Sequence, residues 1–562
     1  MGTSGNNPGY KVFSISTTIR NPRRNTEFLE VLKEFDDMDL TNDVKDEIYY
    51  ELIRRGIYKF NKLDSIIKEK YKDGIILTDS EIKRIINDNP QKTGDEGRVM
   101  TQIRALKDTG LVSLSGNSRH LLHLKLTKLG LNLINGYDSE NVYTKAMVGL
   151  HANNPQRFTI YNKARPFLNT LFVIKELNKH YQNEKGLLWH EFAVFVLSMK
   201  DCNYKKVVSK IIEYREQYEH QIVQPILEDY LYNEVGVNRI QFRSILKDYA
   251  DDVFRKFDMT GLLVSSGFGE NVYIRFNDYN KMKVESLLEE YSDYQFETFT
   301  TDEEYFNFLS NIKLPWEESE EVKREIIQSK VELLGVNVND SDSLDKQLSQ
   351  LDNIHNKRIF DSSISNYELE LIKEELLMLG KNKDNRSKFN DIPEPVRLEW
   401  LIALATAKIY GAEYVKPNLT LDEKGIPKSF ASGGMADIEF ITDELYCLIE
   451  VTLQQDYKQQ LNNETTSISD HLKQLKTEKE KYSLLIAPRI HDRVAQFFKF
   501  ITMVERLSVV ALTIEYYVNM IETNPTIEKF RNVIKYLNEK MCGESGTTAY
   551  CDFINNFRIE GT

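Results

Sequence analysis

The clearest hydrophobic pattern in the N-terminal part of the chain lies between residues 77 and 136. Apolar side chains at Val99, Ile103 and Leu106 recur at helical spacing, and the polar residues between them fall mostly off this stripe. Two apolar strands follow, and we expect the turn Gly116-Asn117 to join them. Helix, helix and β-hairpin in this order predict a winged-helix fold.

The same order of elements returns farther along the chain. Helical patterns at residues 167–181, 186–200 and 204–217 precede the segment 243–277, in which a helix, the letters TGLLV, a turn and a strand follow one another. The letters TGLV stand at the corresponding place in the first pattern. This weak internal repeat predicts a second winged helix, arising either by duplication or by convergence on a common small fold.

The pattern changes twice in the C-terminal half. Residues 291–384 are helical and acidic, which predicts a linker domain. Beyond them come helix, two strands, helix, strand, helix, strand and terminal helix, which predict an α/β domain with a mixed sheet. We therefore expect a multidomain protein with α+β winged-helix domains at residues 1–150 and 151–290, a helical linker at 291–384, and the α/β domain at 385–562.

Composition agrees with several folded domains. The chain has 562 residues, 41% of them hydrophobic and 28% charged, which is too long for one core and too apolar for a disordered protein. No apolar run approaches the roughly 18 residues of a membrane span, and the first residues lack the apolar core of a signal peptide. We expect a cytoplasmic protein without a membrane partner. The four cysteines are scattered, which indicates neither a zinc site nor a disulfide framework.

The net charge of −13 argues at first against a nucleic-acid partner, because phosphate neutralisation needs Lys and Arg. The distribution of charge matters more than the sum. Acidic residues concentrate in stretches such as Thr301–Glu321, whereas the first 150 residues are nearly balanced and contain basic clusters. Binding to DNA through the N-terminal half is therefore compatible with this composition.

Two carboxylates in the predicted α/β domain stand out. Asp437 lies in the strand MADIEFI and Glu450 in the next strand, LYCLIEVTL, with a short turn at residues 442–444 between them. Glu450 interrupts an otherwise apolar strand, where a bare carboxylate is costly unless it is paired or bound to a metal. A solvated pair of strand carboxylates is the plain alternative. Two carboxylates at facing strand positions would form a hard-oxygen site for Mg²⁺.

The surrounding motifs extend this interpretation. The order helix, Gly-rich turn (SGGMAD), Asp strand, Glu strand and helix resembles the PD-(D/E)XK nuclease core. More closely, LEWLIALA, SGGMADIEF, YCLIEVTL, NNETTSISDHLKQLK and LLIAP together resemble the catalytic domain of the AlwI-like type IIS restriction endonucleases and of related nicking enzymes. The start, KVFSISTTIRNPRRNTEFLEVLKEF, is similar to the N-terminus of AlwI-type proteins.

The resemblance implies a set of site residues in the α/β domain. Asp437 and Glu450 would bind Mg²⁺, Val451 would offer its backbone carbonyl, and Glu399 would orient a metal-bound water. Glu464 and His471 would share a helix face if helix persists there, since they lie seven residues apart. The implied catalytic set is Glu399, Asp437, Glu450, Val451, Glu464 and His471.

One position departs from the general motif. Strand alternation puts Thr452, rather than Lys, on the same face as Glu450. Threonine carries no positive charge to stabilise the scissile phosphate or to position water. Lys458, Gln454 and His471 are the alternatives for this role, and the family resemblance favours His471.

The N-terminal half supplies candidate DNA-binding residues. Because Pro22 disfavours helix at Asn21, we expect the neighbouring arginines to project from an extended arm, and arginine pairs well with guanine edges and phosphate. A merely soluble basic terminus is the alternative. The candidates are Arg20, Arg23 and Arg24 in the arm, Arg98, Gln102 and Arg104 in the first recognition helix, Lys107 and Arg119 as phosphate contacts, and Arg243, Lys247 and Arg255 in the second winged unit.

The resemblance implies a type IIS endonuclease that binds a short asymmetric site in double-stranded DNA and cuts a few nucleotides outside it. Double-strand cleavage would need a second nuclease domain, from a transient homodimer or a separate small subunit. The alternatives are a strand-specific nicking enzyme or the large subunit of a heterodimer, and a winged-helix regulator with an inactive nuclease-like domain. A restriction system would also include a cognate DNA methyltransferase.

Overall fold

The computed structural model describes residues 10–16, 18–58, 60, 62–72, 76–89, 95–116, 121–155, 162–237, 241–381, 387–390, 392–429, 435–454, 460, 465–544 and 546–559. The chain divides into two compact units. Unit 1 comprises Met1–Ile57 and Gln91–Leu351, and unit 2 comprises Tyr58–Pro90 and Asp352–Thr562. The four domains predicted from the sequence are a finer division and stay a prediction.

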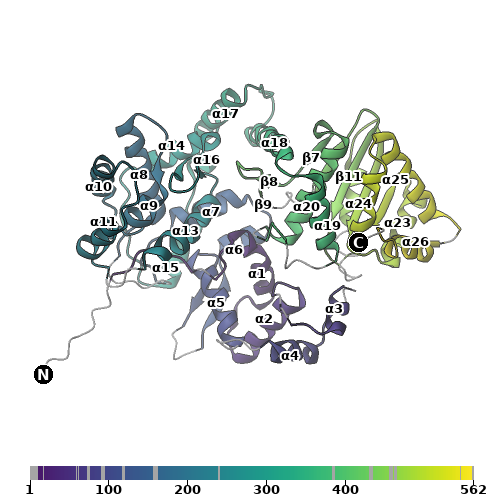
Figure 1. Ribbon diagram of the computed structural model, residues 1–562, viewed down its shortest axis with the longest axis horizontal. Coiled ribbons are helices and arrows are strands. Elements are labelled where there is room, and N and C mark those ends of the chain that lie inside the picture. Colours follow the sequence, from purple (N-terminus) through teal and green to yellow (C-terminus); the bar gives the residue numbers. More distant parts are fainter. Residues whose placement is uncertain are drawn as a thin grey trace. The chain divides into compact units, whose positions relative to one another are not determined.

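The first part of unit 1 surrounds a three-stranded antiparallel sheet with the strand order β1-β3-β2. Val99, Ile103 and Leu106 are buried, as the hydrophobic stripe predicts, and helices α2 and α5 pack against each other (Figure 1). The elements are η1 (Pro22–Arg24), α1 (Asn25–Leu32), η2 (Lys33–Phe35), β1 (Met38–Asp39), α2 (Asn42–Arg54), α5 (Asp95–Asp108), β2 (Val112–Ser115), β3 (His123–Leu126), α6 (Lys128–Ile134) and α7 (Ser139–Val148).

A second sheet in unit 1, with the order β4-β6-β5, repeats this topology. In both sheets a short strand pairs with the second strand of a hairpin that follows a helix. The elements are α8 (Pro166–Tyr181), β4 (Leu187–Leu188), α9 (Trp189–Glu191), the π-helical turn η3 (Phe192–Val196), α10 (Tyr204–Tyr218), α11 (Gln224–Asp229), the π-helical turn η4 (Tyr230–Val235), α12 (Phe242–Ser244), the π-helical turn η5 (Ile245–Tyr249), α13 (Ala250–Asp258), β5 (Leu263–Ser266) and β6 (Tyr273–Phe276).

The first hairpin differs from its prediction. Its last strand pair is Ser115 with His123, so residues 116–122 connect the strands, rather than the two-residue turn Gly116-Asn117. Burial of apolar residues in both strands fixes this register, because a slip by one residue would turn them to the solvent. Residues 117–120 lie outside the described part of the chain.

The described elements that follow β6 in unit 1 are helices, and those after residue 291 agree with the helical pattern predicted there. They are η6 (Asp278–Asn280), α14 (Lys281–Glu290), α15 (Asp302–Asn311), α16 (Pro315–Glu318) and α17 (Glu320–Leu334). Helix α18 (Leu344–Ser363) begins in unit 1 and ends in unit 2. The predicted linker, residues 291–384, thus contributes to both units.

Unit 2 is built on a five-stranded sheet with the order β13-β12-β11-β10-β7. Strands β11, β12 and β13 are parallel, whereas β10 is antiparallel to β11 and to β7, which confirms the predicted mixed sheet. The strands are β7 (Val415–Pro417), β10 (Ile438–Ile441), β11 (Leu445–Val451), β12 (Glu480–Ala487) and β13 (Val509–Thr513), with a separate hairpin of β8 (Thr420–Leu421) and β9 (Pro427–Ser429).

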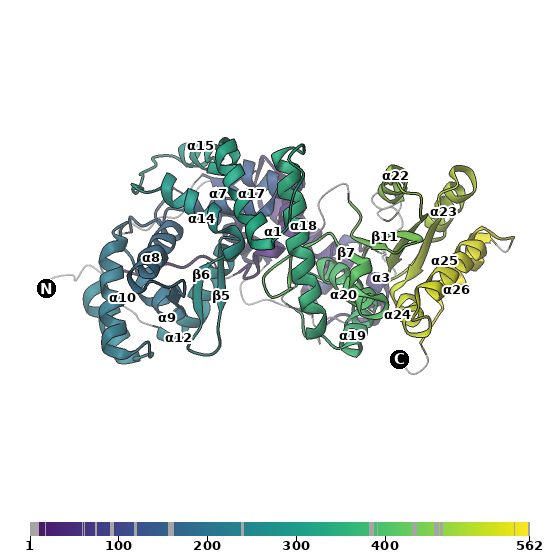
Figure 2. The ribbon, with the colours of Figure 1, turned by 90° about the horizontal axis from the view of Figure 1, so that it is seen from above.

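Helices cover both faces of this sheet. Helices α20 and α22 lie on opposite sides of it (Figure 2), and the ring of Tyr410 at the end of α20 packs on Phe440 of β10. Besides the end of α18, the described helices of unit 2 are α3 (Ser65–Lys72), α4 (Asp79–Asp88), η7 (Ile364–Asn366), α19 (Leu369–Gly380), α20 (Glu394–Tyr410), η9 (Ala412–Tyr414), α22 (Thr466–Gln474), α23 (Asp492–Glu505), α24 (Ile514–Thr523), α25 (Ile527–Cys542) and α26 (Gly546–Asn555).

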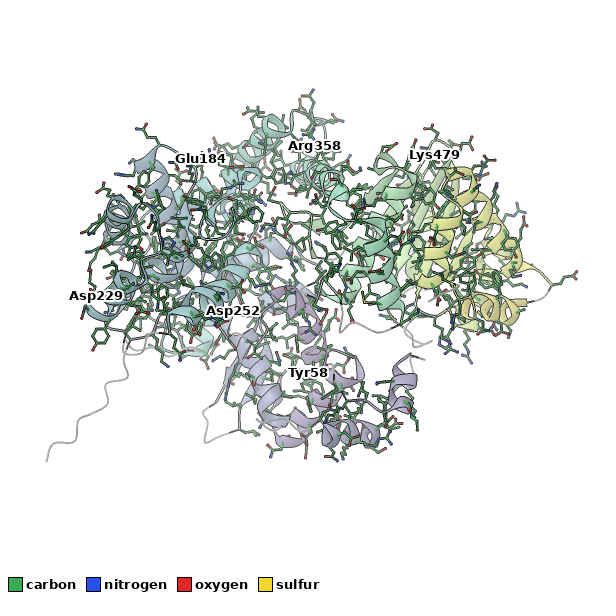
Figure 3. The ribbon with its side chains drawn as sticks, in the orientation of Figure 1. Tyr58, Glu184, Asp229, Asp252, Arg358 and Lys479 are labelled. Carbon is green, nitrogen blue, oxygen red and sulfur yellow. The ribbon has the colours of Figure 1, made fainter. Side chains whose placement is uncertain are left out.

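Two boundaries in unit 2 differ from the predicted ones. The helix predicted after the two strands ends at Gln474, and strand β12 already begins at Glu480. The connecting residues have tertiary partners: Lys479, labelled in Figure 3, donates from Nζ to the carbonyl of Thr442, and the backbone N–H of Glu480 donates to Glu444. After β13 three helices follow where one was predicted. Among the described residues, none of the helices is both long and apolar enough to cross a membrane.

Candidate active site

The register of β10 and β11 brings Asp437 and Glu450 together. Ile438 pairs with Ile449, so Asp437, one residue before β10, continues the ladder opposite Glu450. Directly opposite residues of neighbouring strands point to the same face of a sheet. The turn between the strands is held by Thr442, whose hydroxyl accepts from the N–H of Leu445 at 3.0 Å. The two strands joined by the short turn are thus antiparallel neighbours, with the two carboxylates at facing positions.

Hydrogen bonds hold both carboxylates. The backbone N–H of Val451 donates to Asp437 Oδ2 at 2.8 Å. Glu450 is only 6% exposed, and Nδ1 of His471 on α22 lies 2.8 Å from its Oε1. This hydrogen bond with the Glu450 carboxylate raises the pKa of His471 above its ordinary value, against the lowering effect of burial. The buried carboxylate therefore has a neighbour that carries positive charge when protonated.

A third strand contributes residues that sequence reasoning missed. Pro417 of β7 pairs with Ile438, which places Asn418 opposite Asp437 on the other side from Glu450. Nδ2 of Asn418 donates to the carbonyl of Ala436 at 2.8 Å and to Glu439 Oε1 at 3.1 Å. Asn418 Oδ1 is buried and accepts no hydrogen bond from the described residues. Lys416 of β7 and Asn418 directly after it alternate with apolar residues, but this signal is short and β7 was not predicted.

The next row of the same face contains an ion pair. Lys416 Nζ lies 2.7 Å from Glu439 Oε1, and the hydroxyl of Tyr446 also donates to Glu439. Burial raises the pKa of Glu439, but hydrogen bonds from Lys416, Tyr446 and Asn418 outweigh it and lower the pKa overall. Glu439 therefore stays ionised beside the site, with its charge balanced by Lys416.

The other implied residues fall at different places. Glu399 is buried in α20 at 5% exposure. Thr452 is buried directly after β11, and its hydroxyl accepts from the N–H of Gln454 at 3.1 Å. Glu464 and Lys458 lie outside the described residues, so the predicted helix face shared by Glu464 and His471 is not tested.

The donor chemistry of the site suits a hard cation. Within the described ranges, no group of three or more His, Cys, Asp and Glu side chains is arranged to hold a metal ion. The groups that the three strands bring together are two carboxylates and an amide oxygen that lacks a donor. Oxygen donors of this kind fit Mg²⁺, whereas zinc favours thiolate and imidazole ligands.

The predicted N-terminal arm is not extended. Asn21 has extended backbone angles, as expected before proline, but Pro22–Arg24 form a 3₁₀ helix that runs into α1. The side chain of Asn21 caps this turn by accepting from the N–H of Arg23, and proline suits the first position of a helix because it needs no N–H donor there. The extended-arm prediction is therefore wrong.

Contacts within unit 1 hold Arg20 and Arg24. Arg20 donates from Nε to Asp251 at 2.9 Å and from a terminal nitrogen to the carbonyl of Lys247 at 3.1 Å. Arg24 donates to Glu27 at 3.0 Å and to the carbonyl of Ile57. These contacts join the N-terminal segment to η5 and α13 and to the residues that follow α2.

Helix α13 itself is rich in internal ion pairs. Asp252, labelled in Figure 3, is paired with Lys256 at 2.6 Å, and burial raises the pKa of Asp252 to about 6. Arg255 pairs with Asp251 at 2.8 Å. Of the other candidate DNA contacts, Arg243, Lys247 and Arg104 are exposed, Gln102 is half-buried and Lys107 lies 3.8 Å from Asp108. The Arg98 side chain and Arg119 lie outside the described residues.

Comparison with known proteins defines the class of enzyme. The model of the AlwI restriction endonuclease family matches residues 107–520, so the chain belongs to this family. No curated protein matches.

Solved structures give weaker likenesses. The small subunit R.BspD6I2 of the heterodimeric restriction endonuclease R.BspD6I has a TM-score of 0.28 and 23% identity, covering 33% of this chain and 97% of its own. The restriction endonuclease FokI has a TM-score of 0.24 and 12% identity, covering 93% of this chain and 98% of its own.

Proposed function

We propose that this chain is a type IIS restriction endonuclease that hydrolyses phosphodiester bonds a few nucleotides outside a short asymmetric DNA site, using Mg²⁺. Family membership supports the reaction class. The observation that carries the metal-dependent chemistry is the position of Asp437 opposite Glu450, both held by hydrogen bonds. The cut itself would be made by unit 2, which contains this pair.

Each site residue has a role in this proposal. Asp437, Glu450 and the carbonyl of Val451 would hold Mg²⁺, which supplies an activated water and stabilises the charge on the departing oxygen. The N–H of Val451 orients Asp437, and His471 orients Glu450. Glu399 and Glu464 would orient water around this centre.

His471 also stands in for the lysine that the general motif has at position 452. It contacts Glu450 directly, whereas Thr452 is buried and engaged with Gln454. When DNA is bound, the hydrogen bond between the imidazole and Glu450 would loosen. The imidazole would then hydrogen-bond to the scissile phosphate or to the attacking water. Lys458 and Gln454 are the other candidates for the lysine role.

The N-terminal half would bind the recognition site through two winged helices. The matching sheet orders β1-β3-β2 and β4-β6-β5, each with a helix before the hairpin, support this assignment. Helices α5 and α13 would then be the recognition helices. Arg98, Gln102 and Arg104 would contact bases, Lys107 and Arg119 phosphate, and Arg23, Arg243, Lys247 and Arg255 the flanking backbone.

Double-strand cleavage would use the nuclease unit of a second copy. On α23, Phe500, Met503 and Val504 are 55%, 63% and 63% exposed, and they continue a stripe that starts at Arg493 with coiled-coil spacing. An enzyme that only nicks, and a separate small subunit that cuts the second strand, are the alternatives. A cognate methyltransferase would protect the host DNA.

Substitution of the two carboxylates tests this function. We expect Asp437→Asn and Glu450→Gln to abolish plasmid cleavage in Mg²⁺ while leaving binding to the cognate duplex within about twofold. Asp443→Asn is the matched control, because Asp443 is an exposed acid in the turn between the same strands. If binding and cleavage are lost to the same extent, the two carboxylates stabilise the fold rather than take part in the reaction.

The buried Thr452 favours a second candidate function, a DNA-binding regulator whose nuclease-like domain is inactive. Incubation of supercoiled plasmid with Mg²⁺ or with EDTA separates the two functions. A regulator would leave the plasmid intact under both conditions, whereas the proposed enzyme nicks or linearises it only with Mg²⁺. Run-off sequencing of the product would then give the site, the offset and the strands cut.

A further inference from the structure

Asn418 belongs to a row of three polar residues across neighbouring strands. It lies opposite Asp437, which directly precedes β10, and Asp437 in turn lies opposite Glu450 on β11. The backbone N–H of Asn418 donates to the carbonyl of Asp437 at 3.0 Å, which fixes this alignment. All three side chains therefore leave the sheet on the same face.

The orientation of the Asn418 amide is determined by its partners. Nδ2 donates to the carbonyl of Ala436 and to a carboxylate oxygen of Glu439. Neither of these groups can donate a hydrogen bond in return, so a flipped amide would set its oxygen against two acceptors. Oδ1 therefore keeps its position, buried and without a hydrogen-bond donor in the described part of the chain.

A buried carbonyl oxygen without a donor is costly, and native proteins rarely retain one without a reason. Here the oxygen belongs to the residue next to a candidate magnesium ligand. Amide oxygens bind hard cations as neutral ligands beside carboxylates. The orphaned acceptor and the position in the row are independent observations, and both indicate a ligand supplied from outside the chain.

We propose that Asn418 is a further oxygen donor of the metal site, with Oδ1 adding a neutral ligand to the carboxylates of Asp437 and Glu450. Its amide nitrogen, anchored to Glu439, holds that oxygen in place. The inference rests on the proposed metal-dependent function.

Metal affinity measured without DNA tests the proposal. The full-length protein is titrated with Mn²⁺, and binding is followed by electron paramagnetic resonance of the free ion. We expect Asn418→Ala to weaken Mn²⁺ binding about 10-fold, a loss typical of removing one group that supports a metal site. Binding within about twofold of wild type would overturn the proposal.

A second variant separates the oxygen from the anchoring amide. The variant Asn418→Asp retains an oxygen at the Oδ1 position but replaces the amide nitrogen, so the hydrogen bonds of that nitrogen to Ala436 and Glu439 are lost. We expect this variant to bind Mn²⁺ at least as tightly as wild type. If it melts like wild type but loses affinity as much as Asn418→Ala, the oxygen is not a ligand.

The same titration distinguishes the two failures. Wild-type protein that binds no Mn²⁺, or binds it equally well as Asp437→Asn, would contradict the proposed function itself. Wild-type binding that Asp437→Asn removes but Asn418→Ala leaves unchanged would contradict only the role of Asn418.

Discussion

His471 Nδ1 lies 2.8 Å from Glu450 Oε1, so a helix on one face of the sheet holds a carboxylate of the strand beneath it. We expect His471→Ala to slow plasmid cleavage by ~10²-fold or more, a size typical of losing one positioned acid–base or electrostatic group. Affinity for the cognate duplex should change little. Single-turnover cleavage and gel-shift assays measure the two effects separately.

Thr452→Lys is the companion to this substitution. If His471 replaces the missing lysine, adding Thr452→Lys to His471→Ala should recover part of the lost rate. If His471→Ala cuts at the wild-type rate while Lys458→Ala is inactive, Lys458 rather than His471 replaces the lysine of the general motif.

Replacing Mg²⁺ by Ca²⁺ should permit specific binding without turnover. Ca²⁺ is larger and accepts irregular oxygen coordination, so it can occupy the carboxylates without the near-octahedral geometry of Mg²⁺. Cleavage and DNA affinity in each ion check this expectation. Robust cutting in Ca²⁺ would contradict the proposed metal chemistry.

Arg20 should act on DNA affinity through α13. The guanidinium of Arg20 is engaged by Asp251 and by the carbonyl of Lys247. We therefore expect Arg20→Ala to weaken binding to the cognate duplex and to a random duplex by similar factors. Asp251→Ala should produce the same pattern. A loss of ~1–3 kcal/mol of specific binding, with a relaxed preference at one base pair, would contradict this expectation. In that case Arg20 would break its contact with Asp251 in the DNA complex and contact that base itself.

The exposed stripe of α23 should be needed for the second cut alone. We expect Phe500→Glu to nick plasmid at nearly the wild-type rate but to form linear product at least ~10-fold more slowly, because a charge in an apolar interface is costly. Tyr137→Glu, another exposed aromatic, is the matched control. If Phe500→Glu forms linear product at the wild-type rate, α23 is not part of the dimer interface. If the wild-type chain itself only nicks plasmid, the second cut is made by a separate subunit.

The ion pair between Arg531 and Glu480 should make unit 2 sensitive to acid. Hydrogen bonds from Arg531 lower the pKa of Glu480 to about 2, so its stabilising contribution is present above the unfolded value of about 4.5 and is lost as the pH falls towards 2. We expect Arg531→Gln to lower the melting temperature at pH 7, and this difference to shrink below pH 4. A difference independent of pH would mean that packing, rather than charge, accounts for it.

The sequence was sufficient where periodicity and burial agree. The apolar stripe through Val99 and Ile103 predicts α5, and the apolar strand around Glu450 predicts β11 and its neighbours in a mixed sheet. The pairing of Asp437 with Glu450 follows from the short turn between the two strands.

Tertiary contacts explain what the sequence did not predict. Strand β7 has only three residues, too few for a periodic signal, so the position of Asn418 beside Asp437 could not be foreseen. The contact of Arg20 with Asp251 could not be foreseen, because the two residues lie 231 positions apart in the sequence. Proline before the arginines indicated an extended segment, although the same residue also starts helices.

The discontinuity of unit 2 has a consequence for synthesis. Residues 58–90 leave the ribosome while the rest of their unit is still untranslated. At ordinary elongation rates, roughly ten seconds or longer pass before Asp352 and the residues after it are synthesised. During this time helices α3 and α4 therefore lack the second segment of their unit, which begins at Asp352. A slow codon or a stalled ribosome between the two segments would lengthen this exposure, and expression yield should depend on that stretch of the message.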